Sequence, residues 1–181
     1  MNVEEALCAI SGGDERAFLW LYNSAQPRLL GYATGILAGD RAAAEDVVDE
    51  AFMAVWQQAG RYSASGSADG WLRRIVRNKV IDHLRRMHST RHCELADDQL
   101  ERIADVAAGP DRIAEKNSAR DELVRALARL SPDHREAVWL CYFEELPLSE
   151  IAQQVGCPEN TVKTRLFHAR KALRSILAPH A

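Results

Sequence analysis

Residues 130–177 read LSPDHREAVWLCYFEELPLSEIAQQVGCPENTVKTRLFHARKALRSIL, and their pattern predicts the helices of this part of the chain. Its first residues are typical of a helix start. The hydroxyl of Ser131 can accept a free backbone amide, and Pro132 lacks the N–H that the first turn of a helix leaves without a partner. Apolar residues then recur at helical spacing. We therefore expect a helix from Pro132 to about Phe143.

Two further helices follow in the same stretch. A short one over 148–155 is predicted to end at Gly156, because glycine readily adopts the left-handed backbone conformation that a tight interhelical turn requires. A long one then runs from about Glu159 to Leu177. A short helix, a glycine turn and a long helix together predict a helix-turn-helix unit.

The outward face of the long helix is basic. Five Lys and Arg residues and no Asp or Glu occur between Thr161 and Arg174. Long cations near the start of such a helix can contact phosphates and guanine edges in a major groove. A merely solvated basic helix is the alternative, and the turn that precedes this one favours DNA binding. The candidate contact residues are Asn160, Thr161, Lys163, Thr164, Arg165, His168 and Lys171.

Composition limits what the whole chain can be. The chain has 181 residues, 47% of them hydrophobic, and a formal net charge of −3. That hydrophobic fraction is typical of a folded protein, and no apolar run approaches the roughly 18 residues of a membrane span. The acidic N-terminus is unlike a signal peptide. We therefore expect a cytoplasmic protein without membrane insertion, whose four cysteines, none in a CxxC pair, are reduced.

Residues 1–88 are predicted to form an all-helical domain. Apolar residues at helical spacing indicate a first helical pair over 17–37, bent or broken near Pro27, and a second helix from Arg41 to Gln58. The polar face of this second helix is acidic. Its carboxylates lie in the first half, where the helix dipole favours them, so dipole matching and a docking surface for a basic partner are both open explanations.

A small-sidechained polar loop over 60–70 precedes a second basic helix, which Trp71 opens. Its outward residues are predicted to include Arg73, Arg74, Arg77, Asn78, Lys79, Arg85 and Arg86. A loop and an aromatic beside a basic helix suit an unstacked base, although burial in the core is the other explanation for Trp71. Each domain then has one basic helix, and one strip of nucleic acid could contact both.

Residues 89–115 are predicted to be an acidic, flexible linker, and residues 116–181 to form the second domain. The linker segment holds seven Asp and Glu against three Arg and has no sustained helical period. A cluster of His83, His88, His92 and Cys93 lies near its start, in a spacing that matches no closed zinc pattern. No catalytic constellation or phosphate-binding loop is visible. We therefore expect no metal, no other cofactor and no enzymatic activity.

The order of these features resembles one protein family. The segments around Asp14–Phe18, Ala44–Trp56 and Trp71–Arg86 resemble region 2 of the extracytoplasmic-function (ECF) sigma factors of bacterial RNA polymerase. The segment from Leu130 to Leu166 resembles their region 4. The resemblance covers nearly the whole chain apart from the linker and the last residues. It implies an all-α protein of two small helical domains that directs core RNA polymerase to promoters and promotes initiation and DNA melting.

The resemblance also implies a role for each group of candidate residues. In region 2 an acidic helix docks on the clamp helices of the largest polymerase subunit, and the next loop and helix bind the −10 element. Region 4 reads the −35 element with the residues named above and docks on the polymerase flap. The residues carried over for docking are Asp46, Asp49, Glu50, Phe52 and Trp56. Those carried over for the −10 element are Arg61, Ser65, Trp71, Arg73, Arg74, Arg77, Asn78 and Arg86.

The family resemblance leaves the role of the linker and the control of the protein as hypotheses. An acidic linker could imitate nucleic acid in a basic channel of the polymerase, or it could be a simple spacer. An anti-sigma factor commonly covers both domains in this family, so we expect one here. The alternatives to a sigma factor are a sigma-like decoy that sequesters an anti-sigma factor and another helix-turn-helix regulator. Decoys of this kind carry an attached receiver domain, and we expect none here. A helix-turn-helix regulator of another class would leave the first domain unexplained.

Overall fold

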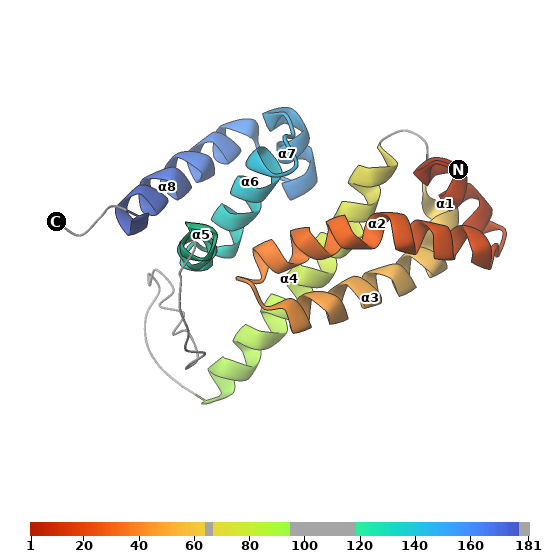
Figure 1. The fold of residues 1–181 in the computed structure, drawn as a ribbon, viewed down its shortest axis with the longest axis horizontal. Helices are drawn as coiled ribbons and strands as arrows, with labels where there is room; N and C mark the ends of the chain where they lie inside the picture. Colours follow the sequence, from red (N-terminus) through yellow and green to blue (C-terminus); the bar gives the residue numbers. More distant parts are fainter. Residues whose placement is uncertain (64–66, 95–118, 178–181) are drawn as a thin grey trace. The chain divides into compact units, whose positions relative to one another are not determined.

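The computed structural model describes residues 1–63, 67–94 and 119–177, and every secondary-structure element in those residues is a helix. Two compact units are present, one built mainly on the first four α-helices and the other on the last four (Figure 1). The predicted all-α fold is confirmed. The elements are α1 (Val3–Ser11), α2 (Glu15–Ile36), α3 (Arg41–Gln58), the 3-10 helix η1 (Ala59–Arg61), α4 (Ala68–Glu94), α5 (Ala119–Ala128), α6 (Pro132–Tyr142), α7 (Leu148–Val155) and α8 (Glu159–Leu177).

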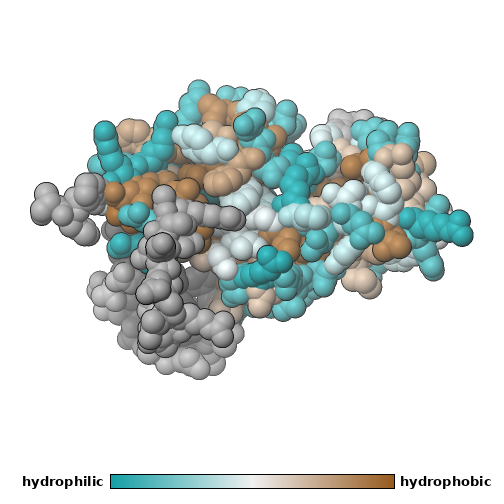
Figure 2. Space-filling view, in the orientation of Figure 1, coloured by the Kyte–Doolittle hydropathy of each residue, from teal (hydrophilic) through white to brown (hydrophobic). Residues whose placement is uncertain are grey.

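In the first unit, α2 and α3 run side by side (Figure 1) and are joined by aromatic contacts. The ring centroid of Phe52 lies 6.2 Å from that of Phe18 and 4.8 Å from that of Tyr22. Helix α4 packs against α3. Apolar residues appear only as separate spots on the face of this bundle seen in Figure 2. The largest fully buried side chains of this unit are Tyr32, Leu7, Leu21, Leu29, Leu72, Val47, Val48, Val76 and Val80.

The acidic-faced helix was predicted correctly at both ends, because α3 spans Arg41–Gln58. Its start is fixed by Asp40, whose carboxylate accepts the backbone N–H of Ala43 at 3.0 Å. This cap satisfies one of the amides that a helix leaves free at its start, and the helix dipole favours the negative charge there. The cap therefore sets where the outward carboxylates of α3 fall.

Proline does not break the first long helix, so the expected break into a helical pair near Pro27 is wrong. Helix α2 continues from Glu15 to Ile36 with Pro27 inside it. A proline in a helix interior costs roughly 3 kcal/mol. Side chains on both sides of the proline are buried, including Leu21 before it and Leu29 after it. Burying such side chains contributes about 1.5–3 kcal/mol each, which offsets that cost.

Helix α4 extends past the expected domain boundary at residue 88 and reaches Glu94. The segment 71–94 contains neither glycine nor proline, so nothing in its backbone chemistry stops the helix. The rest of the predicted acidic linker, over 95–115, lies outside the described residues, and so does Ser65 in the loop before α4.

The second unit has the predicted helix-turn-helix geometry. The Ser131 hydroxyl accepts the backbone N–H of His134 at 3.4 Å at the start of α6. Gly156 has φ +71° and ψ +37°, the left-handed conformation expected at the turn between α7 and α8. Helix α8 packs against α5, α6 and α7. The side chains that fill this core include Leu140, Ile151, Val162, Leu166 and Ala169.

None of the helices in the described part of the chain combines the length and the apolar character needed to cross a membrane.

Candidate nucleic-acid and protein interfaces

Helix α8 is exposed along much of its length, and a row of its exposed side chains faces away from the core. Its inward row is Val162, Leu166 and Ala169, all buried. The exposed row consists of Asn160, Lys163, Thr164, Phe167, His168 and Lys171. We call this set the α8 outward row. The other two predicted contacts, Thr161 and Arg165, are half-buried and lie on the flank of the helix.

Sequence reasoning missed Phe167, which belongs to the α8 outward row. Its side chain is 59% exposed, and its ring centroid lies 5.4 Å from that of His168, edge to face. The signal was present in the spacing, because residues 160, 163, 164, 167 and 171 fall on one helix face. An exposed aromatic among cations supplies an apolar surface that can contact a thymine methyl or a sugar.

Contacts from α6 hold the flank of α8. The Arg165 guanidinium (Nη2) lies 2.6 Å from the Asp133 carboxylate (Oδ2), and the His134 and His168 rings are 6.3 Å apart between centroids. Burial lowers the pKa of His134, as do the nearby His168 and Arg165, while Asp133 opposes that shift. His134 therefore titrates below its ordinary range.

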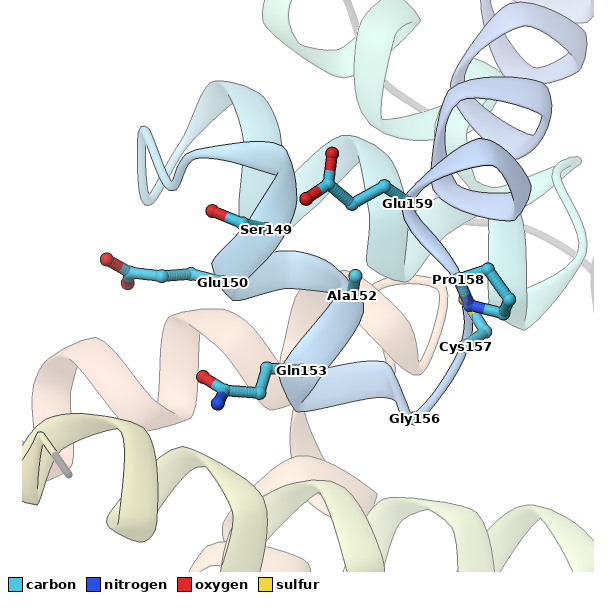
Figure 3. A pocket seen from close by; sticks show the side chains of 8 residues that line it. All are labelled: Ser149, Glu150, Ala152, Gln153, Gly156, Cys157, Pro158 and Glu159. Atoms are coloured by element: carbon cyan, nitrogen blue, oxygen red, sulfur yellow. The ribbon is translucent and has the colours of Figure 1, made fainter. Parts of the chain in front are cut away.

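The turn between α7 and α8 encloses an open hollow of about 500 Å³. Figure 3 shows the carboxylates of Glu150 and Glu159 at this hollow, together with the amide of Gln153. Two carboxylates disfavour phosphate binding, so this hollow differs in charge from the α8 outward row. We assign it no ligand.

Helix α4 presents Arg74, Asn78 and Arg86 to solvent, and Arg77 is half-buried. Arg73 is only 5% exposed, so the expectation that it points outward is wrong. Its neighbours Leu72 and Val76 are buried as well. The burial of Arg73 is therefore decided by packing in the bundle and not by the local charge pattern.

An aromatic contact and an ion pair hold the start of α4. The ring of Trp71 lies 5.7 Å from that of Tyr62, whose hydroxyl donates to Glu4 of α1 at 3.3 Å. Arg28 of α2 pairs with Asp69 in the first turn of α4. Trp71 is thus a half-buried residue with an aromatic neighbour, intermediate between the two roles considered for it. Arg61, the last residue of η1, is exposed.

Helix α3 presents a row of three carboxylates and a methionine. Asp46, Asp49, Glu50 and Met53 recur at i, i+3, i+4 and i+7, all four are exposed, and Met53 is 59% exposed. We call these four the α3 outward row. Tyr22 donates to Asp49 at 3.1 Å, and this hydrogen bond raises the pKa of Tyr22.

Phe52, the other apolar residue expected on this helix face besides Trp56, does not belong to the α3 outward row. Its side chain is 2% exposed and packs against Phe18 and Tyr22. Trp56 is half-buried, and its ring lies 5.4 Å from that of Phe18. The exposed methionine at 53 was not predicted, although its spacing from Glu50 would have indicated it.

Part of the histidine and cysteine cluster near the end of α4 is not described. The side chains of His88, His92 and Cys93 lie outside the described part of the structure. Cys8, Cys141 and Cys157 are free thiols.

Comparison with known families assigns both units. The model of Sigma-70 region 2 matches residues 21–90, and the model of Sigma-70 region 4 matches residues 120–173. The first match covers most of α2 through α4, which contains the α3 outward row and the basic residues of α4. The second covers α5 through most of α8, which contains the α8 outward row.

Three curated relatives are ECF RNA polymerase sigma factors. SigL of Mycobacterium tuberculosis is 35% identical over 144 residues, covering 78% of each chain. SigK of the same species is 27% identical over 183 residues, covering 97% of this chain and 94% of SigK. SigE of Mycolicibacterium smegmatis is 34% identical over 145 residues, and the match spans 80% of this chain but only about half (56%) of SigE.

Two solved structures share the fold. One is the sigma factor RpoE in complex with the anti-sigma factor NepR from Bartonella quintana, with TM-score 0.68, 23% identity, and coverage of 91% of this chain and 98% of that one. The other is CnrH in complex with the cytosolic domain of CnrY, with TM-score 0.66, 20% identity and 98% coverage of both chains. The chain belongs to the ECF RNA polymerase sigma factors. It is an alternative sigma factor.

Proposed function

We propose that this sigma factor docks on core polymerase through the α3 outward row and contacts promoter DNA through α4 and α8. The observation that carries the proposal is the separation of charge between helices. The α3 outward row holds three carboxylates and no cation, whereas α8 holds no carboxylate from residue 160 to 174. A basic protein surface and a polyanion are the complementary partners of these two faces.

The polymerase contact is assigned to Asp46, Asp49, Glu50 and Met53, with Trp56 at the edge. The proposed partner surface is the clamp helices of the largest polymerase subunit. An exposed methionine beside carboxylates supports a protein partner, because interfaces combine an apolar centre with a polar rim.

The −10 contact is assigned to the exposed side chains of α4 and to the loop before it. Arg74 and Asn78 lie one turn apart, and both are exposed. Arg61 lies near the start of this loop, and Trp71 follows it. The cations can neutralise phosphates, and an aromatic ring can stack on a base, so this surface suits an unpaired DNA strand. Ser65 remains a predicted contact.

The −35 contact is assigned to the α8 outward row, including Phe167. Thr164 donates its hydroxyl to the backbone carbonyl of Asn160 at 2.9 Å, which leaves its lone pairs free to accept from a base. Lys163 and Lys171 supply cations on the same face. Asn160, at the start of the helix, is suited to pairing with adenine.

Two further protein partners are proposed: the polymerase flap for the second unit and an anti-sigma factor for both units. Each unit exposes large apolar side chains, with Met53 at 59% on the first and Tyr142 and Phe143 at 53% and 51% on the second. A partner that covered these side chains would remove their apolar surface from water. Of the two structural neighbours, one is in complex with an anti-sigma factor and the other with the cytosolic domain of CnrY. We place the protein in the cytoplasm as a noncatalytic subunit.

Run-off transcription from a genomic promoter pool with core polymerase tests the proposal. Specific transcripts should appear only when this chain is added. Asp46→Lys should abolish them by preventing core binding, whereas Glu122→Lys on α5, the same charge change at an exposed site, should not. Core binding without any transcript would indicate a decoy. If the wild-type chain did not bind core polymerase, the docking assignment of the α3 outward row would be wrong.

A further inference from the structure

An ion pair fixes one cation of the DNA-binding unit to a neighbouring helix. The Arg165 guanidinium of α8 lies 2.6 Å from the carboxylate of Asp133, which is in the first turn of α6. The Arg165 side chain is 22% exposed and that of Asp133 is 60% exposed. The contact is a charge-assisted hydrogen bond, slightly shorter than the roughly 2.7–2.9 Å typical of such bonds.

The position of Arg165 differs from that of the other cations of α8. Lys163 and Lys171 are exposed in the α8 outward row, whereas Arg165 lies on the flank, adjacent to buried Leu166. A further contact between α6 and α8, between His134 and His168, lies beside the same flank. The first turn of α6 therefore touches α8 at the edge of the row assigned to the −35 element.

A carboxylate at this edge repels phosphate and so opposes DNA binding. Its presence at this position therefore suggests a compensating role. The dipole of α6 stabilises the Asp133 charge where it is. The bond to Asp133 orients a planar group that has five N–H donors, most of which remain available to phosphate oxygens. Phosphate contacts of this kind fix the register in which a recognition helix meets the bases.

We propose that Asp133 is a positioning residue for −35 recognition, which holds the Arg165 guanidinium on the flank of α8. From there Arg165 contacts the DNA backbone, and the α8 outward row alone reads base edges. The inference rests on the proposed function of α8 and adds to it how that helix is set in register.

The test uses holoenzyme assembled from core polymerase and the full chain. The probe is a promoter recovered by run-off transcription, compared with the same promoter whose −35 element is replaced. The measured quantity is the ratio of holoenzyme affinities for the two promoters. Asp133→Asn should lower this ratio by about fivefold or more, the low end of what one base pair contributes. Asp133→Glu should restore it.

Two matched variants separate positioning from charge. Glu150→Gln removes one negative charge from the first turn of α7 and should leave the ratio unchanged. Arg165→Lys keeps the charge but loses the planar fork, so it should lower the ratio while leaving binding to the replaced promoter unchanged. Circular dichroism of every variant checks that helical content is retained.

Three results would overturn the inference. If Asp133→Asn and Glu150→Gln both tighten binding to the two promoters equally, Asp133 acts only as a charge. If Asp133→Asn reduces the melting temperature but leaves the ratio unchanged, its role is structural. If wild-type holoenzyme binds promoters but does not distinguish the −35 replacement, the −35 assignment of α8 fails, and this inference fails with it.

Discussion

Glu50 of α3 lies 3.3 Å from Lys79 of α4, measured from carboxylate Oε2 to ammonium Nζ. Arg86 of α4 lies 3.8 Å from the other oxygen of the same carboxylate. A residue assigned to polymerase docking thus also joins the docking helix to the helix assigned to the −10 element. The Glu50 side chain is 46% exposed and that of Lys79 is 33% exposed, so solvent screens the pair.

The first prediction is that this pair contributes little to stability. A double-mutant cycle with Glu50→Gln and Lys79→Met should give a coupling energy of about 0.2–1 kcal/mol by urea unfolding, as measured for exposed ion pairs. A large loss of core binding in Glu50→Gln would then report docking and not unfolding. A coupling energy above about 2 kcal/mol would contradict the prediction and would show that the main role of Glu50 is to stabilise the fold.

The second prediction concerns the turn between α7 and α8. An added Cβ at Gly156 would meet nothing within 4 Å, but the backbone φ of +71° is strained for any residue with a Cβ. Gly156→Ala should therefore destabilise the second unit by about 1–2 kcal/mol through backbone conformation alone. Gly156→Asn should cost less, because asparagine tolerates the left-handed region. Equal losses for both variants in thermal unfolding would show that packing, and not φ, restricts the site.

Local chemistry made the ends of α3, α7 and α8 predictable from the sequence. The bounds Arg41–Gln58 and Leu148–Val155 agree with the prediction because capping residues, prolines and glycine mark them. Helix α1 also had such a signal, which sequence reasoning passed over. Asn2 and Glu5 form a reciprocal capping box, with the Glu5 N–H 2.8 Å from the Asn2 side chain.

The errors at the candidate site concern burial, which depends on residues distant in sequence. Phe52 follows the helical spacing of the core as well as that of a docking face, and only the rings of Phe18 and Tyr22 decide between them. Arg73 lies in a basic run, yet it is 5% exposed. Phe167 was missed for the converse reason, because an aromatic in a sequence is expected to be buried. Periodicity predicts which residues share a face but does not predict which neighbour covers it.

The third prediction distinguishes a cation from an aromatic in the α8 outward row. Lys163→Ala and Phe167→Ala change two exposed residues one turn apart on the same face. Both should weaken holoenzyme binding to a promoter with an intact −35 element. The dependence of binding on salt should differ: Lys163→Ala lowers the slope of log K against log salt by about one, because one fewer counterion is released. Phe167→Ala should leave the slope unchanged.

The measurement is a salt titration of promoter affinity for the wild type and the two variants. Ser175→Ala, at an exposed position later in α8, is the control and should change neither affinity nor slope. An unchanged affinity in Phe167→Ala would place this ring outside the DNA interface. An unchanged slope in Lys163→Ala would mean that its ammonium does not contact phosphate.

The last prediction follows from the lowered pKa of His134. Burial, His168 and Arg165 hold its folded-state pKa below the ordinary value of 6.5, against the opposing effect of Asp133. Between the two pKa values the unfolded chain binds more protons than the folded chain, so stability falls as the pH drops through that window. Above about pH 6.5 His134 is neutral in both states and the full stability is present. The stability decreases as the pH falls from 6.5 to the folded-state pKa of His134, and below that pKa it loses nothing more from this group.

Urea unfolding of the full chain at pH 7.5 and 5.5 measures this effect. Replacing His134 by glutamine removes the titrating group, so the stability lost on acidification should be smaller than in the wild type. His168→Gln removes one neighbour that lowers the pKa and should reduce the same loss only in part, because burial of His134 remains the largest cause. A loss in His134→Gln as large as in the wild type would show that other groups carry the acid sensitivity of this unit.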